Sequence, residues 1–116
     1  MENFEKEDLK IFVEENGVGT RVRWVGKSGA RQPGTFLNPY MDQIISSARN
    51  MVEVDFTELR FMNSPTVMPI LVLLNGLSAK NLPVSVVYDS KSPWQRTVFG
   101  GLKGFSFKGE VAFQAR

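Results

Sequence analysis

The stretch that decides the fold is Asp55–Leu77, with the sequence DFTELRFMNSPTVMPILVLLNGL. It leads from an apolar strand through a short polar segment into an apolar helix. If Ser64 capped this helix, Pro69 would lie inside it, lack one hydrogen bond and press against the preceding turn. If Thr66 is the N-cap, Pro69 is the third helical residue, whose position needs no intrahelical N–H partner. We therefore expect a rigid, exposed loop at residues 63–66, followed directly by the helix.

The helix after this loop is apolar on more than one face. Five residues recur at the spacing of one helix face and are expected to face the core: Val67, Ile70, Leu73, Leu74 and Leu77. Met68, Leu71 and Val72 lie off that stripe, and a helix that is apolar nearly all round is either deeply buried or covered by something else. Methionine also suits an adaptable contact surface. The sequence therefore predicts a protein-binding surface made of the loop and this face, namely Asn63, Ser64, Pro65, Thr66, Met68, Leu71 and Val72.

The rest of the chain alternates between strand and helix patterns. We expect strands at Leu9–Glu14, Val18–Val25, Met51–Phe56, Pro83–Tyr88 and Gly109–Phe113, and further helices at Asn38–Asn50 and Ser92–Phe99. Asn16-Gly17 is a hairpin signal, Asn38-Pro39 is a helix start, and Gly100-Gly101 is expected to halt the last helix. The order β-β-α-β-α-β-α-β predicts a single α/β domain over residues 1–116. Its mixed, mostly parallel sheet begins with an antiparallel hairpin, and helices pack on it.

Composition removes several classes of site. The 116 residues contain neither cysteine nor histidine, which excludes disulfides, thiol nucleophiles, imidazole bases and the commonest zinc ligands. Asp55, Glu58 and Asp89 could supply paired carboxylates, but their spacing does not require it, and Asp55 and Asp89 stand at ordinary turn positions. We expect no catalytic residue, no metal and no cofactor.

Charge and hydropathy bear on whether the chain binds nucleic acid or a membrane, and on its location in the cell. Acidic residues dominate residues 1–19 and basic residues dominate residues 20–50, so the surface is dipolar and lacks a basic stripe for nucleic acid. The N-terminus does not read as a signal peptide. The longest apolar run, Val67–Leu74, is too short to cross a bilayer. We expect a cytoplasmic protein without membrane insertion.

Three features of the chain resemble the STAS family, the domain of bacterial anti-sigma-factor antagonists. The element order is one of them. Val54–Ser64 looks like the strand and "FMDSS" loop of the family, and Gln95–Leu102 is similar to its final helix with a Gly-Leu turn. The resemblance covers roughly residues 8–113. The Asn38-Pro39-Tyr40 segment, and asparagine before Ser64, look closer to divergent STAS-like regulators.

The resemblance implies a non-enzymatic domain for partner-switching signalling. In typical members a kinase phosphorylates a serine in the loop and thereby releases a partner. Aligned on Phe61-Met62, the usual acceptor falls on Pro65, which has no hydroxyl. Three readings remain open: the acceptor has moved to Ser64 or Thr66, the domain is a binder that is never phosphorylated, or both hydroxyls only cap the helix. The implied partners are a kinase-like or anti-sigma-type regulator and, for a switch, a phosphatase.

A second function class is a sensor for a small molecule such as a nucleotide or a lipid. Lys27 and Arg31, in the glycine-rich loop expected at Gly26–Asn38, are the candidate residues for an anionic ligand. The glycines of this loop do not have the spacing of a phosphate-binding motif, so no sequence motif supports this class.

Overall fold

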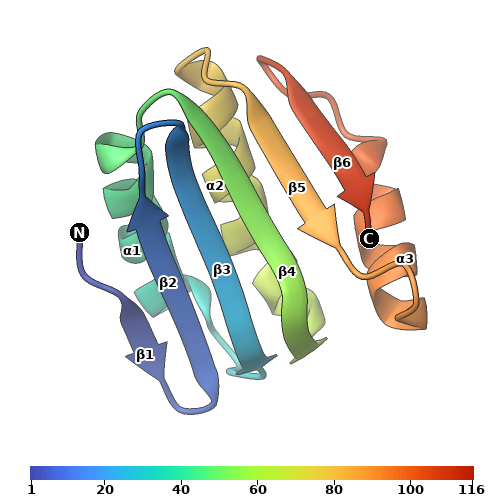
Figure 1. The fold of residues 1–116 in the computed structure, drawn as a ribbon. Helices are drawn as coiled ribbons and strands as arrows, with labels where there is room; N and C mark the ends of the chain where they lie inside the picture. The colour runs from blue at the N-terminus through green and yellow to red at the C-terminus, as the bar shows by residue number, and fades with distance from the viewer.

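Six strands form one mixed sheet in the computed structural model, which describes residues 1–116. Three α-helices and a short 3₁₀ helix, η1, connect the strands (Figure 1). The elements, in chain order, are β1 Phe4–Lys6, β2 Leu9–Glu15, β3 Gly19–Ser28, α1 Gly34–Ser47, β4 Met51–Met62, η1 Ser64–Thr66, α2 Val67–Ala79, β5 Val84–Tyr88, α3 Pro93–Lys103 and β6 Val111–Ala115.

The strands lie in the sheet in the order in which they occur in the chain. β1, β2 and β3 pair antiparallel, and β3, β4, β5 and β6 then pair parallel to one another. Each parallel neighbour is reached through one helix, as a parallel pair requires. The predicted α/β architecture is confirmed, including the N-terminal antiparallel hairpin. The sequence analysis missed one element, the short edge strand β1.

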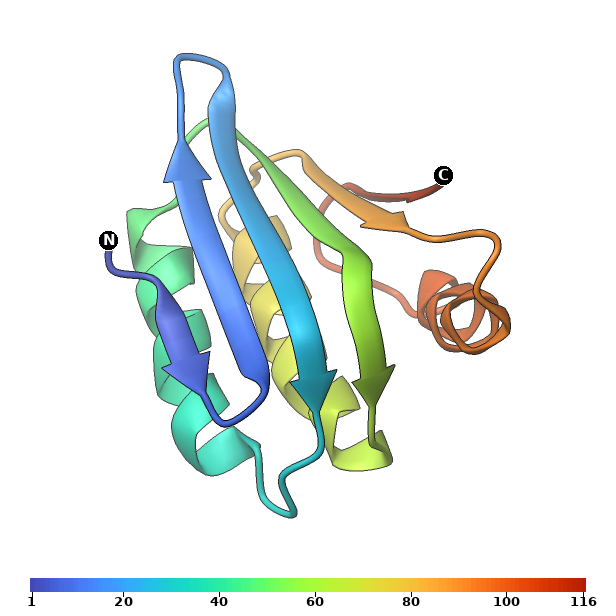
Figure 2. The same cartoon turned by 60° about the horizontal axis from the view of Figure 1, so that its bottom comes forward.

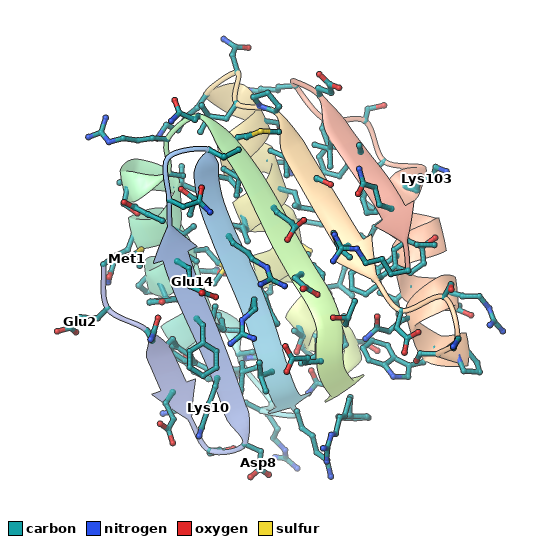
Figure 3. All side chains as sticks on the ribbon, viewed as in Figure 1. Met1, Glu2, Asp8, Lys10, Glu14 and Lys103 are labelled. Atoms are coloured by element: carbon teal, nitrogen blue, oxygen red, sulfur yellow. The ribbon has the colours of Figure 1, made fainter.

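All three helices cover the same face of the sheet. In Figures 1 and 2, α1 and α2 lie side by side behind the central strands, and α3 lies near the edge formed by β5 and β6. The core between these layers contains the fully buried Trp24, Phe56 and Phe99. Trp24 contacts Phe56 with ring centroids 5.3 Å apart, and Phe56 contacts Phe99 at 4.6 Å. The opposite face of the sheet has no helix and carries polar side chains, among them Lys10 and Glu14 of β2 (Figure 3).

Strand β3 shows the predicted alternation only from Thr20 onward. Thr20, Val22 and Trp24 are buried under the helices, while Arg21 and Arg23 lie on the open face. Val18, the first residue of the strand expected at Val18–Val25, is 68% exposed. The prediction failed there because Val18 lies in the β2–β3 turn, whose N–H groups bond the side-chain oxygen of Asn16.

Helix α1 begins five residues before the predicted first helical residue, Pro39. Its first residue is Gly34 instead of a residue after an Asn38 cap, and Pro39 lies inside it. Pro39 removes one backbone hydrogen bond and is itself exposed. Leu37, one turn before Met41, is fully buried. Burial of this additional apolar residue offsets the missing bond, which explains why the helix includes the proline.

The last helix does not stop at its glycines. α3 continues through Gly100-Gly101 to Lys103, although each glycine costs about 1 kcal/mol relative to alanine in a helix interior. Phe99 and Leu102 are both buried, so the turn that contains the glycines carries core contacts. Tertiary packing thus overrides the local preference. No helix in the structure is long and apolar enough to cross a membrane.

Candidate functional site

Strand β4 is longer than expected and ends at the candidate site. The prediction ended it at Phe56, but it continues to Met62, and two register shifts against β3 accommodate the extra residues. Leu59 is buried and Phe61 is 50% exposed. The alternation of Leu59 and Phe61 with polar residues was the available signal for a longer strand. Because of this extension, Phe61 reaches the same end of the sheet as the loop at residues 63–66.

A chain of buried and partly buried hydrogen bonds holds this loop. Asn63 donates through its side-chain amide to the carbonyl of Ala30 at 2.7 Å, and its backbone N–H donates to the carbonyl of Ser28 at 3.0 Å. Its side-chain oxygen accepts a bond from the Thr66 hydroxyl at 2.7 Å. The hydroxyls of Ser28 and Thr66 are 2.8 Å apart. Since the Thr66 proton is already used, Ser28 is the donor in that pair. These bonds attach the loop to the end of β3 and to the β3–α1 connection, as a rigid loop requires.

The loop separates its two hydroxyl residues. Thr66 is fully buried, so the expectation that it is exposed is wrong. Its hydroxyl belongs to the internal hydrogen-bond chain and does not cap α2. Ser64 and Pro65 are exposed, and Ser64 is the first residue of η1, which leads directly into α2. Of the two candidate acceptors, only Ser64 presents its side chain to solvent.

The start of α2 follows the predicted register. The helix begins at Val67, and Pro69 is its third residue. Met68 is 62% exposed and Val72 is half-buried. Leu71 is only 8% exposed and belongs to the core, which corrects its assignment to the outer face. The helix is apolar nearly all round because the sheet and α1 cover most of it.

Phe61, Ser64, Pro65 and Met68 lie within eight consecutive residues at the junction of β4 and α2, and we call these four residues the β4–α2 surface. All four are exposed, and the buried hydrogen-bond chain holds the segment that carries them. Sequence reasoning missed Phe61 because it placed residues after Phe56 outside the strand. Asn63 and Thr66, which were also predicted to bind a partner, lie in the same loop, but their side chains form hydrogen bonds within the protein.

Several exposed basic residues lie in the segments that lead to the β4–α2 surface. Lys27, Arg31 and Arg60 are all exposed, and neither residues 20–41 nor residues 59–88 contain an acidic residue. Lys27 lies in strand β3 and not in the loop where it was expected. A shallow depression of about 590 Å³ beside it is also lined by Lys10 and Arg60, but Asp8 and Glu58 contribute opposite charges, and Arg31 is not part of its lining. The two predicted ligand residues therefore do not line a common cavity.

The acidic residues of the open sheet face are bound in ion pairs. Arg21 donates to Asp55 at 2.7 Å and to Glu53 at 3.0 Å. Burial by itself raises the pKa of Asp55, but hydrogen bonds from Thr57 and Arg21 outweigh it and hold this pKa below its usual value. Asp55 lies within β4 and does not end a strand, contrary to the prediction.

The two other candidate carboxylates lie apart from Asp55 and have their own partners. Glu58 pairs with Arg23 at 3.0 Å, and Asp89 accepts a bond from the N–H of Lys91 within a turn. No group of three or more acidic side chains is placed to hold a metal ion. The three carboxylates do not form a common site.

Comparison with known proteins finds similar folds but no close sequence relative. No protein-family model matches the chain, and no curated protein matches it. A chain in the crystal structure of the diguanylate cyclase SiaD in complex with its activator SiaC, from Pseudomonas aeruginosa, is 15% identical with a TM-score of 0.72, over 100% of both chains. A further structure of SiaC of Pseudomonas aeruginosa is 16% identical with a TM-score of 0.64, again over 100% of both chains.

The anti-sigma factor antagonist SpoIIAA, in its unphosphorylated form, is 19% identical with a TM-score of 0.61. The alignment covers 91% of this chain and 89% of SpoIIAA. The chain therefore has the STAS-like fold that the sequence predicted. The proteins it resembles in structure are regulators that act on other proteins: SiaC is an activator bound to a cyclase, and SpoIIAA is an antagonist of an anti-sigma factor.

Proposed function

We propose that this chain is a non-enzymatic regulatory domain that binds a protein partner through the β4–α2 surface. It acts in partner-switching signalling in the cytoplasm, and phosphorylation of Ser64 releases the partner. The partner is a kinase-like or anti-sigma-type regulator, and a phosphatase reverses the modification. The similarity to SpoIIAA and SiaC supports a protein-binding role, and the residues of the site supply the details.

The observation that carries this proposal is the exposure of two large apolar side chains beside a rigid loop. Phe61 and Met68 are 50% and 62% exposed, respectively, and Ser64 and Pro65 lie between them in the chain. Because the hydrogen bonds of Asn63 and Thr66 already fix the loop, binding orders little additional backbone, which lowers the entropic cost of association. Apolar side chains presented by a pre-ordered segment are the features expected of an interface centre.

Ser64 is well placed for a switch. Its side chain makes no hydrogen bond within the protein, and it stands at the N-terminal end of η1 and α2. A phosphate there would gain from the helix dipole and from the neighbouring basic residues. It would add about −1.5 to −2 charge in the middle of the β4–α2 surface. A partner that contacts Phe61 and Met68 would then meet a hydrated, negatively charged group.

Lys27, Arg31 and Arg60 define the chemistry of the partner. They place positive charge on β3, on the β3–α1 connection and on β4, which Asp8 and Glu58 offset in part, while residues 59–88 contribute no acid. Complementary charge speeds association and suppresses wrong partners. The partner should therefore present an apolar pocket for Met68 surrounded by acidic residues. Phosphate at Ser64 would partly cancel the positive charge that attracts such a partner.

The decisive experiment compares two charge substitutions at exposed apolar residues. Tagged wild type, Met68→Glu and Val18→Glu are purified from the native host, and retained proteins are quantified by mass spectrometry. Val18 is the matched control because it is 68% exposed but lies in the β2–β3 turn. We expect Met68→Glu to lose the partner and Val18→Glu to retain it. Equal retention by both variants would contradict the proposed surface.

Phosphorylation is tested on the same preparations. Phosphosite mapping should find phosphate on Ser64 and none on Thr66, whose hydroxyl is buried. Ser64→Glu should reduce partner retention, whereas Ser64→Ala should retain the partner under all growth conditions. If Ser64→Glu binds as well as Ser64→Ala, the switch is refuted while the binding surface stands.

The alternative function, a nucleotide or lipid sensor, rests on a different observation. Lys10, Lys27 and Arg60 line the shallow depression next to β3 and could meet an anionic group. Thermal unfolding with a nucleotide panel and with anionic vesicles separates the two functions. Stabilisation that is lost in Lys27→Ala would favour the sensor, because a ligand that binds the folded state raises the melting temperature.

A further inference from the structure

Strand β6 forms one edge of the sheet, and its outward backbone groups are unpaired. The N–H of Val84 donates to the carbonyl of Glu110, and the N–H of Arg116 donates to the carbonyl of Tyr88. The even-numbered residues from Glu110 to Arg116 therefore turn their backbone groups toward β5. The groups that point away from the sheet belong to the alternate residues, Val111, Phe113 and Ala115. None of them makes a hydrogen bond beyond the sheet.

The two edges of the sheet differ in how they are protected. Strand β1 at the other edge has only three residues, Phe4–Lys6, and two of them are charged. Short and charged edge strands discourage pairing with another chain. β6 has the sequence VAFQA, without a charge, a proline or a glycine. It is a regular, uncharged edge that offers three outward N–H groups and three outward carbonyls.

The charges that flank β6 are self-complementary. Glu110 directly precedes the strand and Arg116 directly follows it, and both are exposed. Glu110 makes no ion pair within the chain, and Arg116 has one, at 3.3 Å to Glu53. In an antiparallel pairing of two β6 strands centred on Phe113, Glu110 of each copy stands opposite Arg116 of the other.

We infer that β6 pairs antiparallel with β6 of a second copy of this chain, centred on Phe113, and that the two sheets form one continuous sheet. In this register Phe113 faces Phe113, and Val111 faces Ala115 of the other copy. These are the residues with outward backbone groups, so every such group gains a hydrogen bond. Glu110 and Arg116 fall at non-hydrogen-bonded positions, where side chains on opposite strands are closest. A twofold interface of this kind is the commonest in oligomers.

Aromatic residues near this edge are also incompletely covered. Phe105, in the connection between α3 and β6, is 53% exposed. Phe107 and Phe113 are half-buried and contact each other with ring centroids 6.4 Å apart. Figure 1 shows α3 and this connection on the side of the sheet next to β6. A second copy would bring its own aromatic residues to the same place and cover apolar surface that one chain leaves in water. The interface uses no residue of the β4–α2 surface, so it is independent of the proposed function.

The first experiment measures molar mass by light scattering over a dilution series. The wild type should approach twice the 13.0 kDa of the chain. Glu110→Arg and Arg116→Glu each place like charges opposite one another, and each should raise the dissociation constant about tenfold, as two altered cross-strand pairs imply. An equimolar mixture of the two variants should dimerise again, because the arginines of one variant would then face the glutamates of the other. Glu5→Arg, on strand β1, is the control and should dimerise like the wild type.

The second experiment tests the register with cysteines, which the native chain lacks. Ala112 should face Gln114 of the other copy, with Cα atoms about 4.5 Å apart, within disulfide range. A mixture of Ala112→Cys and Gln114→Cys should therefore cross-link under mild oxidation. Either variant alone should not, since identical residues would be about 7–8 Å apart diagonally.

Two results would overturn the inference. One is a wild type that stays at the mass of one chain at every concentration. The other is cross-linking of Ala112→Cys with itself in preference to the mixture, which would require a different register. Loss of dimerisation in Glu5→Arg would also contradict it, because β1 would then take part in the interface.

Discussion

Thr66 determines what the loop after β4 can do. Its hydroxyl links Asn63 to Ser28 and so joins the start of α2 to the end of β3. This use as an internal bridge removes it from solvent and leaves Ser64 as the exposed hydroxyl of the loop. The same residue therefore both supports the proposed surface and narrows the proposed switch to one position.

Replacing this hydroxyl should destabilise the protein. Thr66→Val keeps the shape of the side chain but removes its hydroxyl. The side-chain oxygen of Asn63 and the hydroxyl of Ser28 then lose their hydrogen-bond partner, at a cost of about 1–3 kcal/mol. Chemical denaturation measures the free energy of unfolding. Ser64→Ala is the control and should change it by less than about 0.5 kcal/mol, as for most surface substitutions. Equal stability of the two variants would show that the hydrogen-bond chain does not hold the loop.

At the scale of elements, the pair α1–α2 explains why α2 is apolar on several faces. The sheet covers one side of α2 and α1 covers another, so Leu71 is buried while Met68 remains in water. The close approach of the helices depends on Gly76. A Cβ atom at this position would lie 2.2 Å from Cδ1 and 2.8 Å from Cγ1 of Ile45.

Gly76→Ala should therefore destabilise the protein despite the better helix propensity of alanine. The added methyl group forces Ile45 to move, and overpacking of this kind typically costs about 1–3 kcal/mol. Gly100→Ala is the matched control: it also lies in a helix, has open space around its Cβ position, and should stabilise by up to about 1 kcal/mol. Thermal unfolding of both variants measures the difference. In an Ile45→Ala background the cost at Gly76 should largely disappear.

At the scale of the whole molecule, the sheet has one covered face and two unlike edges. The helices bury the apolar side of the strands β2 to β5, while ion pairs such as Arg21–Asp55 satisfy charges of the open face. Strand β1 covers the edge of β2, and Phe4 is the residue of β1 whose ring packs on α1. The ring of Phe4 contacts Phe36 at 5.8 Å and Tyr40 at 5.1 Å between centroids.

Phe4→Ala should detach β1 and expose the edge of β2. We expect a loss of about 2 kcal/mol in the free energy of unfolding, below the value for a fully buried phenylalanine. Hydrogen exchange should show faster exchange of the β2 amides that bond β1. Glu5→Ala, on the same strand but exposed, should leave both quantities near those of the wild type. Unchanged exchange in Phe4→Ala would mean that the Phe4 ring is not what holds β1 on the sheet.

The amino-acid sequence by itself determined the element order, the parallel sheet with its first hairpin, and the register of α2. These follow from local causes: apolar periodicity, turn residues, and the two prolines at Pro65 and Pro69 that leave few possible helix starts. The same causes placed the candidate site at the loop before α2. The absence of histidine and cysteine narrowed the possible chemistry without any structure.

Only the tertiary structure decided which side chains reach solvent. Thr66 is buried where its hydroxyl bonds Asn63 and Ser28, Leu71 packs in the core, and Phe61 is exposed near the end of β4. α1 and α3 continue through Pro39 and Gly100-Gly101 because burial of Leu37, Phe99 and Leu102 outweighs local preference. Exposure and packing depend on residues distant in the chain, which no local pattern contains. The asymmetry of the two sheet edges, on which the inferred pairing of β6 depends, likewise exists only after the strands have assembled.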